Sequence, residues 1–242
     1  MLKTFHGGVH PNDMKAPTAD KAIVELDPPK ELVFPVTQHI GAPAVPCVNV
    51  GDRVYMGQKI ADAGGYVSAC IHSSVSGTVK AIEKRMNPNG LFVDSIVIEN
   101  DGLDEIDPDI QGHGDFKKLS AKEIIEIIKA AGLVGLGGAT FPVHVKLSPP
   151  PEAKIDYVIV NAAGCEPYLT SDYRTMLEVP DDIINGLKVI MHIFGLKTGY
   201  IGIEDNKPEA VKIMTEAAAK QKDVQIQVIT LKTKYPQGGE KQ

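Results

Sequence analysis

The chain has 242 residues, enough for two ordinary domains, and 43% of them are hydrophobic, which supports real cores. Its formal net charge is -6 and aromatic residues make up 5%, so nucleic acid is not expected to be the main partner. No apolar run approaches membrane-spanning length, and the N-terminus lacks the apolar core of a secretory signal. Any membrane association is therefore expected to be peripheral.

The three cysteines, Cys47, Cys70 and Cys165, are scattered and form no C-x-x-C motif. They cannot supply a four-cysteine cluster or zinc site within this chain. An odd count without a secretory signal fits a reducing compartment. His6 and His10 could ligate a metal, but two histidines in a polar arm are more often solvated, so no metal site is expected.

Residues 1–30 are expected to form an N-terminal arm, and residues 31–102 an all-β domain. In the second range, short apolar runs alternate with turn signals. The predicted strands are Glu31–Phe34, Val45–Val48, Arg53–Tyr55, Val75–Ile82 and Ser95–Glu99.

Two glycine-punctuated motifs in this range, residues 50–61 and 73–79, resemble the barrel-sandwich hybrid of biotinyl and lipoyl carrier domains. Those domains carry their cofactor on a lysine in the hairpin between the two motifs. Tyr66 stands at that position here, so the resemblance implies a structural module or an interaction surface, and argues against a covalent carrier. Residues 103–118 are expected to be an acidic, solvated linker and not a calcium loop.

From residue 119 to residue 242 the pattern changes to alternating helices and strands. Ser120 and Glu123 form a capping-box pattern at the start of a helix that Gly132 ends. Strands separated by helices of this length predict a parallel sheet. The predicted strands are Ile155–Asn161, expected to be buried, Thr198–Ile203 and Val224–Leu231; the predicted helices are Asp181–Phe194 and Lys207–Lys220.

A glycine-rich stretch, residues 132–146, is the first candidate for a binding site. It includes Gly135, Gly137 and Gly138, followed by Phe141 and Lys146. Successive N–H groups in a glycine loop can form an anion-binding concavity, and a nearby lysine adds charge. A phosphate below and an aromatic ring above would suit a nucleotide or flavin. The alternative is an ordinary tight loop before a proline.

Two further loops combine small residues with acids at strand ends. Asn161 and Glu166 follow the first predicted strand, and Gly238, Gly239 and Glu240 follow the last. Ligands of open parallel sheets lie beyond the carboxyl ends of the strands, so these two loops and the glycine-rich stretch are expected to share one rim of the α/β domain. The alternative for the first of them is an ordinary turn with Ser171 or Asp172 as a helix cap.

These motifs together resemble the RnfC subunit of the bacterial Rnf complex, along essentially the whole chain. The resemblance rests on the stretches that begin at Phe5, Gly135, Asn161, Gly202 and Lys234. More distantly, the glycine loop resembles that of the FMN- and NADH-binding flavoprotein subunit of respiratory complex I. The implied fold is a Rossmann-like parallel-sheet domain that binds FMN and NADH, preceded by a barrel-sandwich hybrid domain.

The resemblance also implies residue roles. Gly135, Gly137, Gly138 and Lys146 would cradle the FMN phosphate and ring, with Asn161 beside the flavin. Phe141 would pack against the NADH adenine, Glu166 and Glu240 would hold ribose or nicotinamide, and Gly238 and Gly239 would line the same site. No residue is expected to act as a catalytic acid or nucleophile. The sequence departs from the complex I subunit at three positions. Leu136 replaces an arginine of that subunit, and Ala163 and Gly164 replace acidic residues.

The family further implies electron transfer between NADH and iron–sulfur clusters through FMN, in a ferredoxin:NAD oxidoreductase. RnfC relatives continue into a segment with two cysteine-rich [4Fe–4S] motifs, so this chain is expected to be an amino-terminal part without turnover of its own. The expected partners are the other Rnf subunits and NADH, at the cytoplasmic face of the bacterial plasma membrane. The alternative is a non-catalytic docking subunit with a vestigial nucleotide site.

Overall fold

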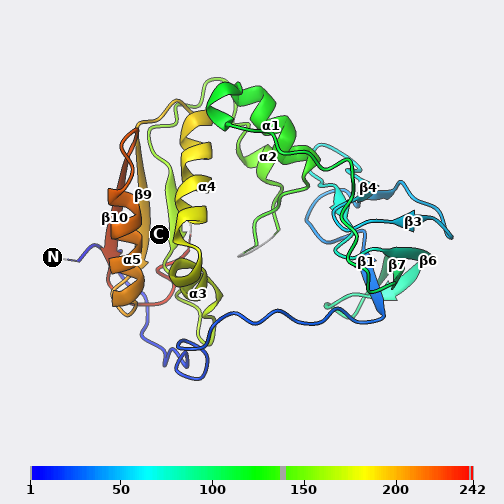
Figure 1. Ribbon diagram of the computed structural model, residues 1–242. Coiled ribbons are helices and arrows are strands. Elements are labelled where there is room, and N and C mark those ends of the chain that lie inside the picture. Colours follow the sequence, from blue (N-terminus) through cyan, green and yellow to red (C-terminus); the bar gives the residue numbers. More distant parts are fainter. Residues whose placement is uncertain (1, 137–139, 240, 242) are drawn as a thin grey trace. The chain divides into compact units, whose positions relative to one another are not determined.

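The computed structural model describes residues 2–136, 140–239 and 241. The chain divides into two compact units, and each is described by itself. The barrel unit comprises residues 26–153. The sheet unit comprises residues 154–242 together with residues 1–25, so the N-terminal arm belongs to the unit formed by the C-terminal half (Figure 1).

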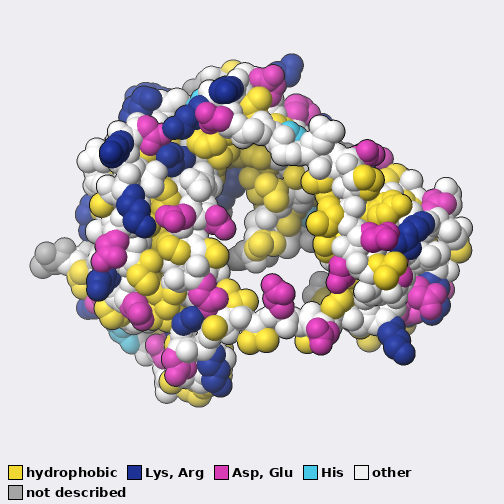
Figure 2. Space-filling view, viewed as in Figure 1, with side chains coloured by type: hydrophobic (Ala, Val, Ile, Leu, Met, Phe, Trp, Pro, Cys, Tyr) yellow, Lys and Arg dark blue, Asp and Glu magenta, His cyan; other side chains and the backbone are white. Residues whose placement is uncertain are grey.

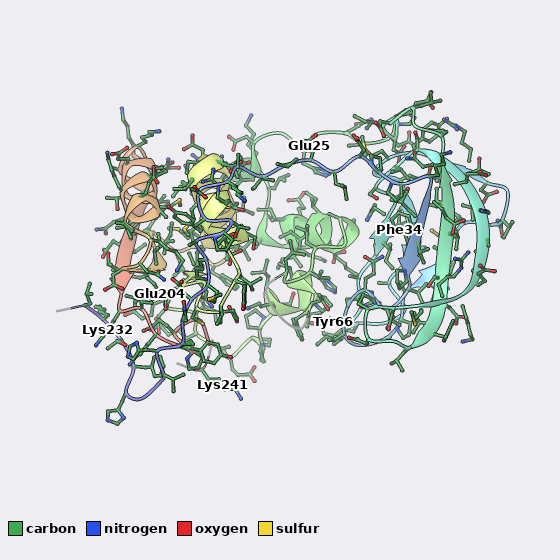
Figure 3. The ribbon with its side chains drawn as sticks, turned by 90° about the horizontal axis from the view of Figure 1, so that it is seen from below. Glu25, Phe34, Tyr66, Glu204, Lys232 and Lys241 are labelled. Atoms are coloured by element: carbon green, nitrogen blue, oxygen red, sulfur yellow. The ribbon has the colours of Figure 1, made fainter. Side chains whose placement is uncertain are left out.

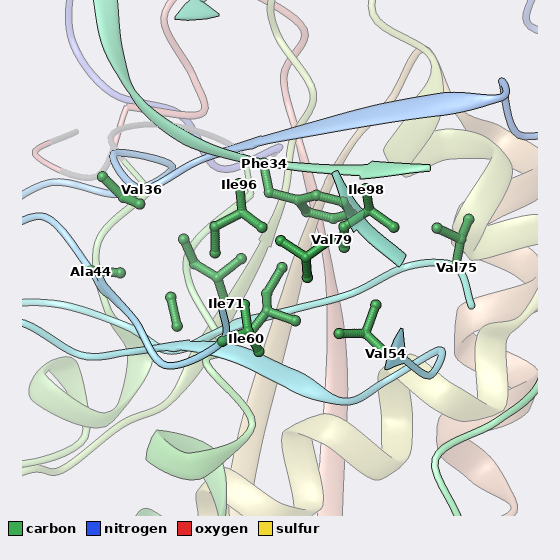
Figure 4. Close-up of a cluster of buried hydrophobic side chains, with 12 residues drawn as sticks. Phe34, Val36, Ala44, Val54, Ile60, Ile71, Val75, Val79, Ile96 and Ile98 are labelled. Atoms are coloured by element: carbon green, nitrogen blue, oxygen red, sulfur yellow. The ribbon is translucent and has the colours of Figure 1, made fainter. Parts of the chain in front are cut away.

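The barrel unit is built from short antiparallel strands in two sheets with the orders β1-β7-β6-β3 and β2-β4-β5. Buried aliphatic side chains from both sheets, with Phe34, form one core (Figure 4). Ile60, Ile96 and Ile98 are completely buried in it. The strands are β1 (Glu31–Pro35), β2 (Val45–Pro46), β3 (Arg53–Val54), β4 (Lys59–Asp62), β5 (Ile71–His72), β6 (Gly77–Met86) and β7 (Phe92–Asn100).

The expected strands of this unit are present but their lengths differ. The strand expected at Val45–Val48 ends at Pro46, and the one expected at Val75–Ile82 begins at Gly77 and continues to Met86. The second half of β6 is mostly exposed, so it lacked an apolar signal. Strands β4 and β5 were not among the predicted strands.

Helix α1 (Ala121–Ala130) and the short helix α2 (Val143–Lys146) follow the barrel strands. The capping box is confirmed: the Ser120 hydroxyl accepts from the Glu123 N–H, and the Glu123 carboxylate accepts from the Ser120 N–H at 2.8 Å. Gly132 ends the helix with φ of 66°. A Cβ at Gly132 would lie 2.1 Å from the Cys70 carbonyl oxygen, so this close approach requires glycine.

The acidic segment after β7 contacts the barrel. Arg53 forms ion pairs of 2.6 Å with Asp101 and with Glu105. The Met56 N–H donates to the Glu105 carbonyl at 2.8 Å, and the Asp107 N–H donates to the Met56 carbonyl at 3.0 Å. These bonds fix the beginning of the segment against β3.

The sheet unit contains a parallel sheet of order β10-β9-β8, which confirms the predicted parallel arrangement. Helices α4 and α5 pack against the sheet and each other, with Leu187, Met191 and Met214 in the core. The α/β plus all-β combination expected from the sequence is therefore present. The elements are β8 (Ile159–Ala162), α3 (Ser171–Glu178), α4 (Pro180–Ile193), β9 (Thr198–Glu204), α5 (Pro208–Ala219) and β10 (Gln225–Leu231).

The prediction of a buried strand at Ile155–Asn161 is wrong in both length and burial. In the described part of the chain, strand β8 lies at an edge of the sheet, beside β9. Tyr157 and Ile159 are 67% and 66% exposed, whereas Val158 and Val160 pack on the core. The apolar run thus alternates between two faces, as an edge strand does. The loop after β8 ends at Thr170, the residue before α3.

Positive and negative side chains are interspersed on the face of the molecule drawn in Figure 2. In the part of the chain that the structure describes, no helix is long and apolar enough to cross a lipid bilayer.

We predict that Gly132→Ala destabilises the chain more than Gly102→Ala does. Both glycines have φ near 70°, so alanine at either costs about 1–2 kcal/mol of backbone strain. Only Gly132 faces a carbonyl oxygen at collision distance, while a Cβ at Gly102 meets nothing within 4 Å. Overpacking adds about 1–3 kcal/mol at Gly132. Urea unfolding followed by circular dichroism measures the difference, and equal losses would contradict the close approach.

Candidate functional site

The carboxyl edge of the β8–β9–β10 sheet is the candidate site. Since the strands are parallel, the segments that follow them emerge at the same edge. These segments, called the rim loops below, are residues 163–170 after β8, 205–207 after β9, and 232–239 after β10, and Asn161 lies in β8 just before the first of them. Two of the three were predicted from the sequence.

Asn161 connects the first and third rim loops. Its side-chain amide donates to the Gly238 carbonyl at 2.6 Å, and its carboxamide oxygen accepts from the Ala163 N–H at 3.3 Å. The Gly238 N–H in turn donates to the Cys165 sulfur at 3.2 Å. A Cβ at Gly238 would lie 3.2 Å from that sulfur, so the contact is tight. The structure therefore brings together Asn161 and Gly238, which the sequence placed in the same site.

Cys165 is buried, and burial is the main cause that raises the pKa of its thiol. A thiol in that state is a packing group and a weak hydrogen-bond partner, not a nucleophile. Glu166 has an exposed side chain next to it.

The centre of the rim holds an ion pair that sequence reasoning missed. Glu204, at the end of β9, is 1% exposed and Lys207 is 4% exposed. The Lys207 amino group lies 3.2 Å from the Glu204 carboxylate and donates to the Ala163 carbonyl at 2.6 Å. The other Glu204 oxygen accepts from the Lys234 N–H at 3.1 Å. The pair therefore contacts all three rim loops (Figure 3 labels Glu204).

Two more lysines of the rim region are buried. Lys234 is 8% exposed and Lys15, from the N-terminal arm, is 7% exposed. Burial, followed by the charge of Lys207, lowers the pKa of Lys15. Among the described residues, the rim thus buries three ammonium groups and one carboxylate, an excess of positive charge. Sequence patterns signal charge but not burial, so these lysines could not be singled out in advance.

The glycine loop, expected from the sequence on the rim of the α/β domain, belongs instead to the barrel unit, residues 26–153. Its base is closed by backbone bonds from the Gly135 N–H to the Phe141 carbonyl and from the Val143 N–H to the Leu133 carbonyl, both 2.9 Å. Phe141 is 37% exposed and Leu136 is 92% exposed. The described part of the loop is thus a hairpin-like excursion on which Leu136 faces solvent.

Helix α2 fixes one side of this loop to the barrel. His144 is buried, and its Nε2 atom lies 3.2 Å from the Tyr66 carbonyl oxygen. The two rings meet edge to face with centroids 6.2 Å apart. Lys146 lies at the C-terminal end of α2 and is exposed. Tyr66, at the position of the carrier lysine, therefore has a packing role beside α2.

Three predicted site residues, Gly137, Gly138 and Glu240, lie outside the described residues. Gly239 is described, and its N–H donates to the Pro236 carbonyl at 2.9 Å in a turn. A shallow groove of about 480 Å³ lies at the amino ends of β9 and β10, lined by Thr198 and Gln225 among others. That end is opposite the rim, so the groove is not the expected site.

Two family models match the chain. The RnfC barrel sandwich hybrid domain matches residues 3–103, and the Nuo51 FMN-binding domain matches residues 128–242. The chain therefore joins a barrel-sandwich hybrid domain to a domain of the Nuo51 FMN-binding type.

Two curated relatives match along essentially the whole chain. The C subunit of the proton-translocating ferredoxin:NAD(+) oxidoreductase complex of Clostridium ljungdahlii is 50% identical over 241 residues, which is 100% of this chain and 52% of that protein. The C subunit of the Na(+)-translocating complex of Acetobacterium woodii is 45% identical over 239 residues, 99% of this chain and 54% of that protein. The chain is thus a homologue of RnfC, and it spans about half the length of these curated relatives.

Solved structures of an NAD+-reducing [NiFe]-hydrogenase resemble part of the chain. The H2-reduced form has a TM-score of 0.42 at 22% identity, covering 50% of this chain and 23% of that one. The air-oxidized form has a TM-score of 0.44 at 20% identity, covering 50% and 22%. Likenesses of this size support no further conclusion.

We predict that Lys207→Met destabilises the chain by about 3–5 kcal/mol, because it leaves the Glu204 carboxylate buried without its counter-charge. The double variant Lys207→Met/Glu204→Gln should recover part of the loss, since the amide still accepts from the Lys234 N–H. Lys212→Met, an exposed lysine of α5, is the matched control. Urea unfolding measures all three. A double variant less stable than Lys207→Met alone would show that the pair is not the source of the loss.

Proposed function

We propose that this chain binds FMN and NAD(H) and is the flavin-bearing part of an Rnf-type ferredoxin:NAD oxidoreductase. The observation that carries the proposal is the rim of the parallel sheet, where the Asn161 amide joins two loops of small residues above a buried excess of lysines. The match of residues 128–242 to the Nuo51 FMN-binding domain supports it. So do the two relatives, both named as the C subunits of ferredoxin:NAD(+) oxidoreductase complexes.

The residues of the rim fit a planar, anionic ligand. Ala162, Ala163 and Gly164 project little side chain, and Gly164 has φ of 59° directly over the Lys207 side chain. The buried positive charge favours an anionic ligand, because the ammonium groups of the rim are already removed from water and, among the described residues, only Lys207 has a buried carboxylate partner. We propose accordingly that the sheet unit is a Rossmann-like domain for FMN and NADH.

Each site residue receives a role in binding and orientation. Gly135, Gly137, Gly138 and Lys146 would hold the phosphate end, and Asn161 would lie beside the ring, with Gly238 and Gly239 next to it. Phe141 would pack on the adenine of NADH, and Glu166 and Glu240 would accept hydrogen bonds from ribose or nicotinamide. When bound, FMN would supply the exchange between a two-electron hydride donor and one-electron acceptors. The chain itself orients the two ligands and excludes water.

The proposed electron acceptors are iron–sulfur clusters, and the proposed partners are other subunits of the Rnf complex. The cysteines at 47, 70 and 165 are too few for a four-cysteine cluster, so we assign the [4Fe–4S] clusters to sequence outside these 242 residues. Other subunits of the Rnf complex would bind this chain at the cytoplasmic face of the membrane. We expect no turnover from residues 1–242 alone.

A docking subunit with a vestigial nucleotide site is the second candidate. Leu136, which stands where complex I has arginine, is almost fully exposed and offers an apolar contact for a protein partner. Ala163 and Gly164 likewise replace acids. The two functions separate in one experiment: titrate FMN into the purified chain under anaerobic conditions, then add NADH. Saturable flavin binding and loss of flavin absorption on adding NADH support the electron-transfer function, and a colourless protein that never binds FMN supports docking alone.

We predict that Lys146→Ala weakens FMN binding roughly tenfold to a hundredfold. A charge-assisted hydrogen bond to phosphate contributes about 1.5–3 kcal/mol, and the loop N–H groups would remain. Riboflavin, which lacks the phosphate, should bind both proteins almost equally. Titrations followed by flavin fluorescence give the four affinities, with Lys122→Ala on the exposed face of α1 as the control. Equal losses for both flavins would show that Lys146 acts on folding or on the ring.

A further inference from the structure

The N-terminal arm runs along the rim of the sheet unit and is hydrogen-bonded to the segment after β10. The Lys232 N–H donates to the Lys3 carbonyl at 3.0 Å. Val9 and Tyr235 exchange both backbone bonds, each 2.8 Å long. The chain's first residues therefore form part of the edge from which the third rim loop emerges.

Lys234 fastens the arm at this point. Its buried amino group donates to the Gly7 carbonyl at 2.8 Å and to the Phe5 carbonyl, and it lies 4.1 Å from the centre of the Phe5 ring. Gly8 is required by the crowding, because a Cβ there would be 2.8 Å from both the Phe5 ring and the Tyr235 carbonyl. Gly8 and Lys234 thus both stabilise the same contact between the arm and the segment after β10.

Lys15 fastens the arm to the first rim loop. Its buried amino group donates to the Glu166 and Leu169 carbonyls, both at 2.6 Å. The Tyr168 N–H donates to the Asp13 carbonyl at 2.8 Å, and Tyr168 has φ of 68°, a conformation that L residues rarely adopt. The arm therefore holds the Glu166–Leu169 segment in a backbone geometry that the segment would not favour by itself.

Further along, the arm is attached to α3. The Thr18 and Thr170 hydroxyls are 2.8 Å apart, Arg174 donates to the Ala19 carbonyl at 3.2 Å, and the Ile23 N–H donates to the Glu178 carboxylate at 3.0 Å. These contacts extend to Glu178, the last residue of α3, the helix that follows the first rim loop. Lys15 is thus fixed from both sides along the chain.

The hydrogen-bond acceptors of Lys15 and Lys234 are neutral carbonyls. Burying an ammonium group against carbonyls costs more than exposing it to water. Such contacts persist only where they fix backbone that would otherwise be free, because a buried carbonyl without a donor is also costly. Lys15, from the arm, fixes the backbone of the loop that carries Glu166. Lys234, from the loop that carries Gly238, fixes the backbone of the arm at Phe5 and Gly7 and so ties that loop to the arm.

We propose that the arm is a built-in part of the rim site, and that Lys15 and Lys234 are positioning residues that hold the loops after β8 and β10 in the arrangement a flavin nucleotide requires. This inference rests on the proposed function. Neither lysine needs to touch the ligand. Their effect reaches it through the Glu166–Leu169 and Tyr235–Gly239 backbones.

The test compares Lys15→Met and Lys234→Met with Lys21→Met, an exposed lysine of the same arm. Amide hydrogen exchange of the ligand-free 242-residue chain reports on the loops, and titration with FMN reports on the site. Lys15→Met should speed exchange in residues 166–170, and Lys234→Met in residues 5–9 and 234–239. Each should weaken FMN binding about tenfold, the loss of one or two loop contacts. Lys21→Met should change neither.

A conservative variant separates positioning from general stability. Lys15→Arg keeps the charge and the donors and should recover most of the FMN affinity that Lys15→Met loses. If Lys15→Met does not fold, Lys15→Gln, which retains a donor amide, takes its place. Faster exchange with unchanged FMN affinity, or no change in either, would overturn the proposal. A wild-type chain that fails to bind FMN would instead overturn the proposed function, and the exchange data would still decide whether the arm holds the loops.

Discussion

The buried Glu204–Lys207 pair is the constraint on which the rim depends. Glu204 ends the central strand β9, and its two oxygens accept from Lys207 and from the Lys234 backbone. Lys207 also donates to Ala163, so a single pair fixes segments that follow all three strands of the sheet. A buried ion pair is weak support for stability by itself. Its value here is geometric, because it sets how closely the loops after β8 and β10 approach each other.

That geometry leaves positive charge in excess. Lys15 and Lys234 add two buried ammonium groups to the pair, and both bind carbonyls. Without a ligand, such an excess opposes folding; with an anionic ligand, part of the cost is recovered as binding energy. The same buried charge therefore affects both the stability of the sheet unit and its proposed function. It lowers the stability of the ligand-free chain, and it favours binding of an anionic ligand.

The sequence predicted those features that depend on local pattern. The Ser120–Glu123 capping box, the helix end at Gly132 and the parallel strands were all readable, because each depends on residues close in the chain. The sequence did not predict features that depend on contacts between residues far apart in the chain. The apolar run at Tyr157–Val160 could not reveal that its strand lies at a sheet edge, and no pattern shows that Lys15 is buried against a loop from the other half of the chain. Asn161 and Gly238 were brought together correctly by the rule for parallel sheets, without knowledge of their bond. The ligand-binding roles of all the predicted site residues stay predictions, and Gly137, Gly138 and Glu240 lie outside the described residues.

The barrel unit shows how a carrier-type module can serve a different purpose. In a carrier domain the hairpin lysine must be free to move, so nothing can pack on it. Here Tyr66 stands at that position, its carbonyl lies within hydrogen-bond distance of buried His144, and Gly132 contacts the neighbouring Cys70. The Tyr66 side chain is 66% exposed, so its contact with α2 is made by its backbone carbonyl and the edge of its ring. The barrel unit thus lacks the carrier lysine and instead supports α1 and α2, the helices that flank the glycine loop, through contacts at Tyr66 and Cys70.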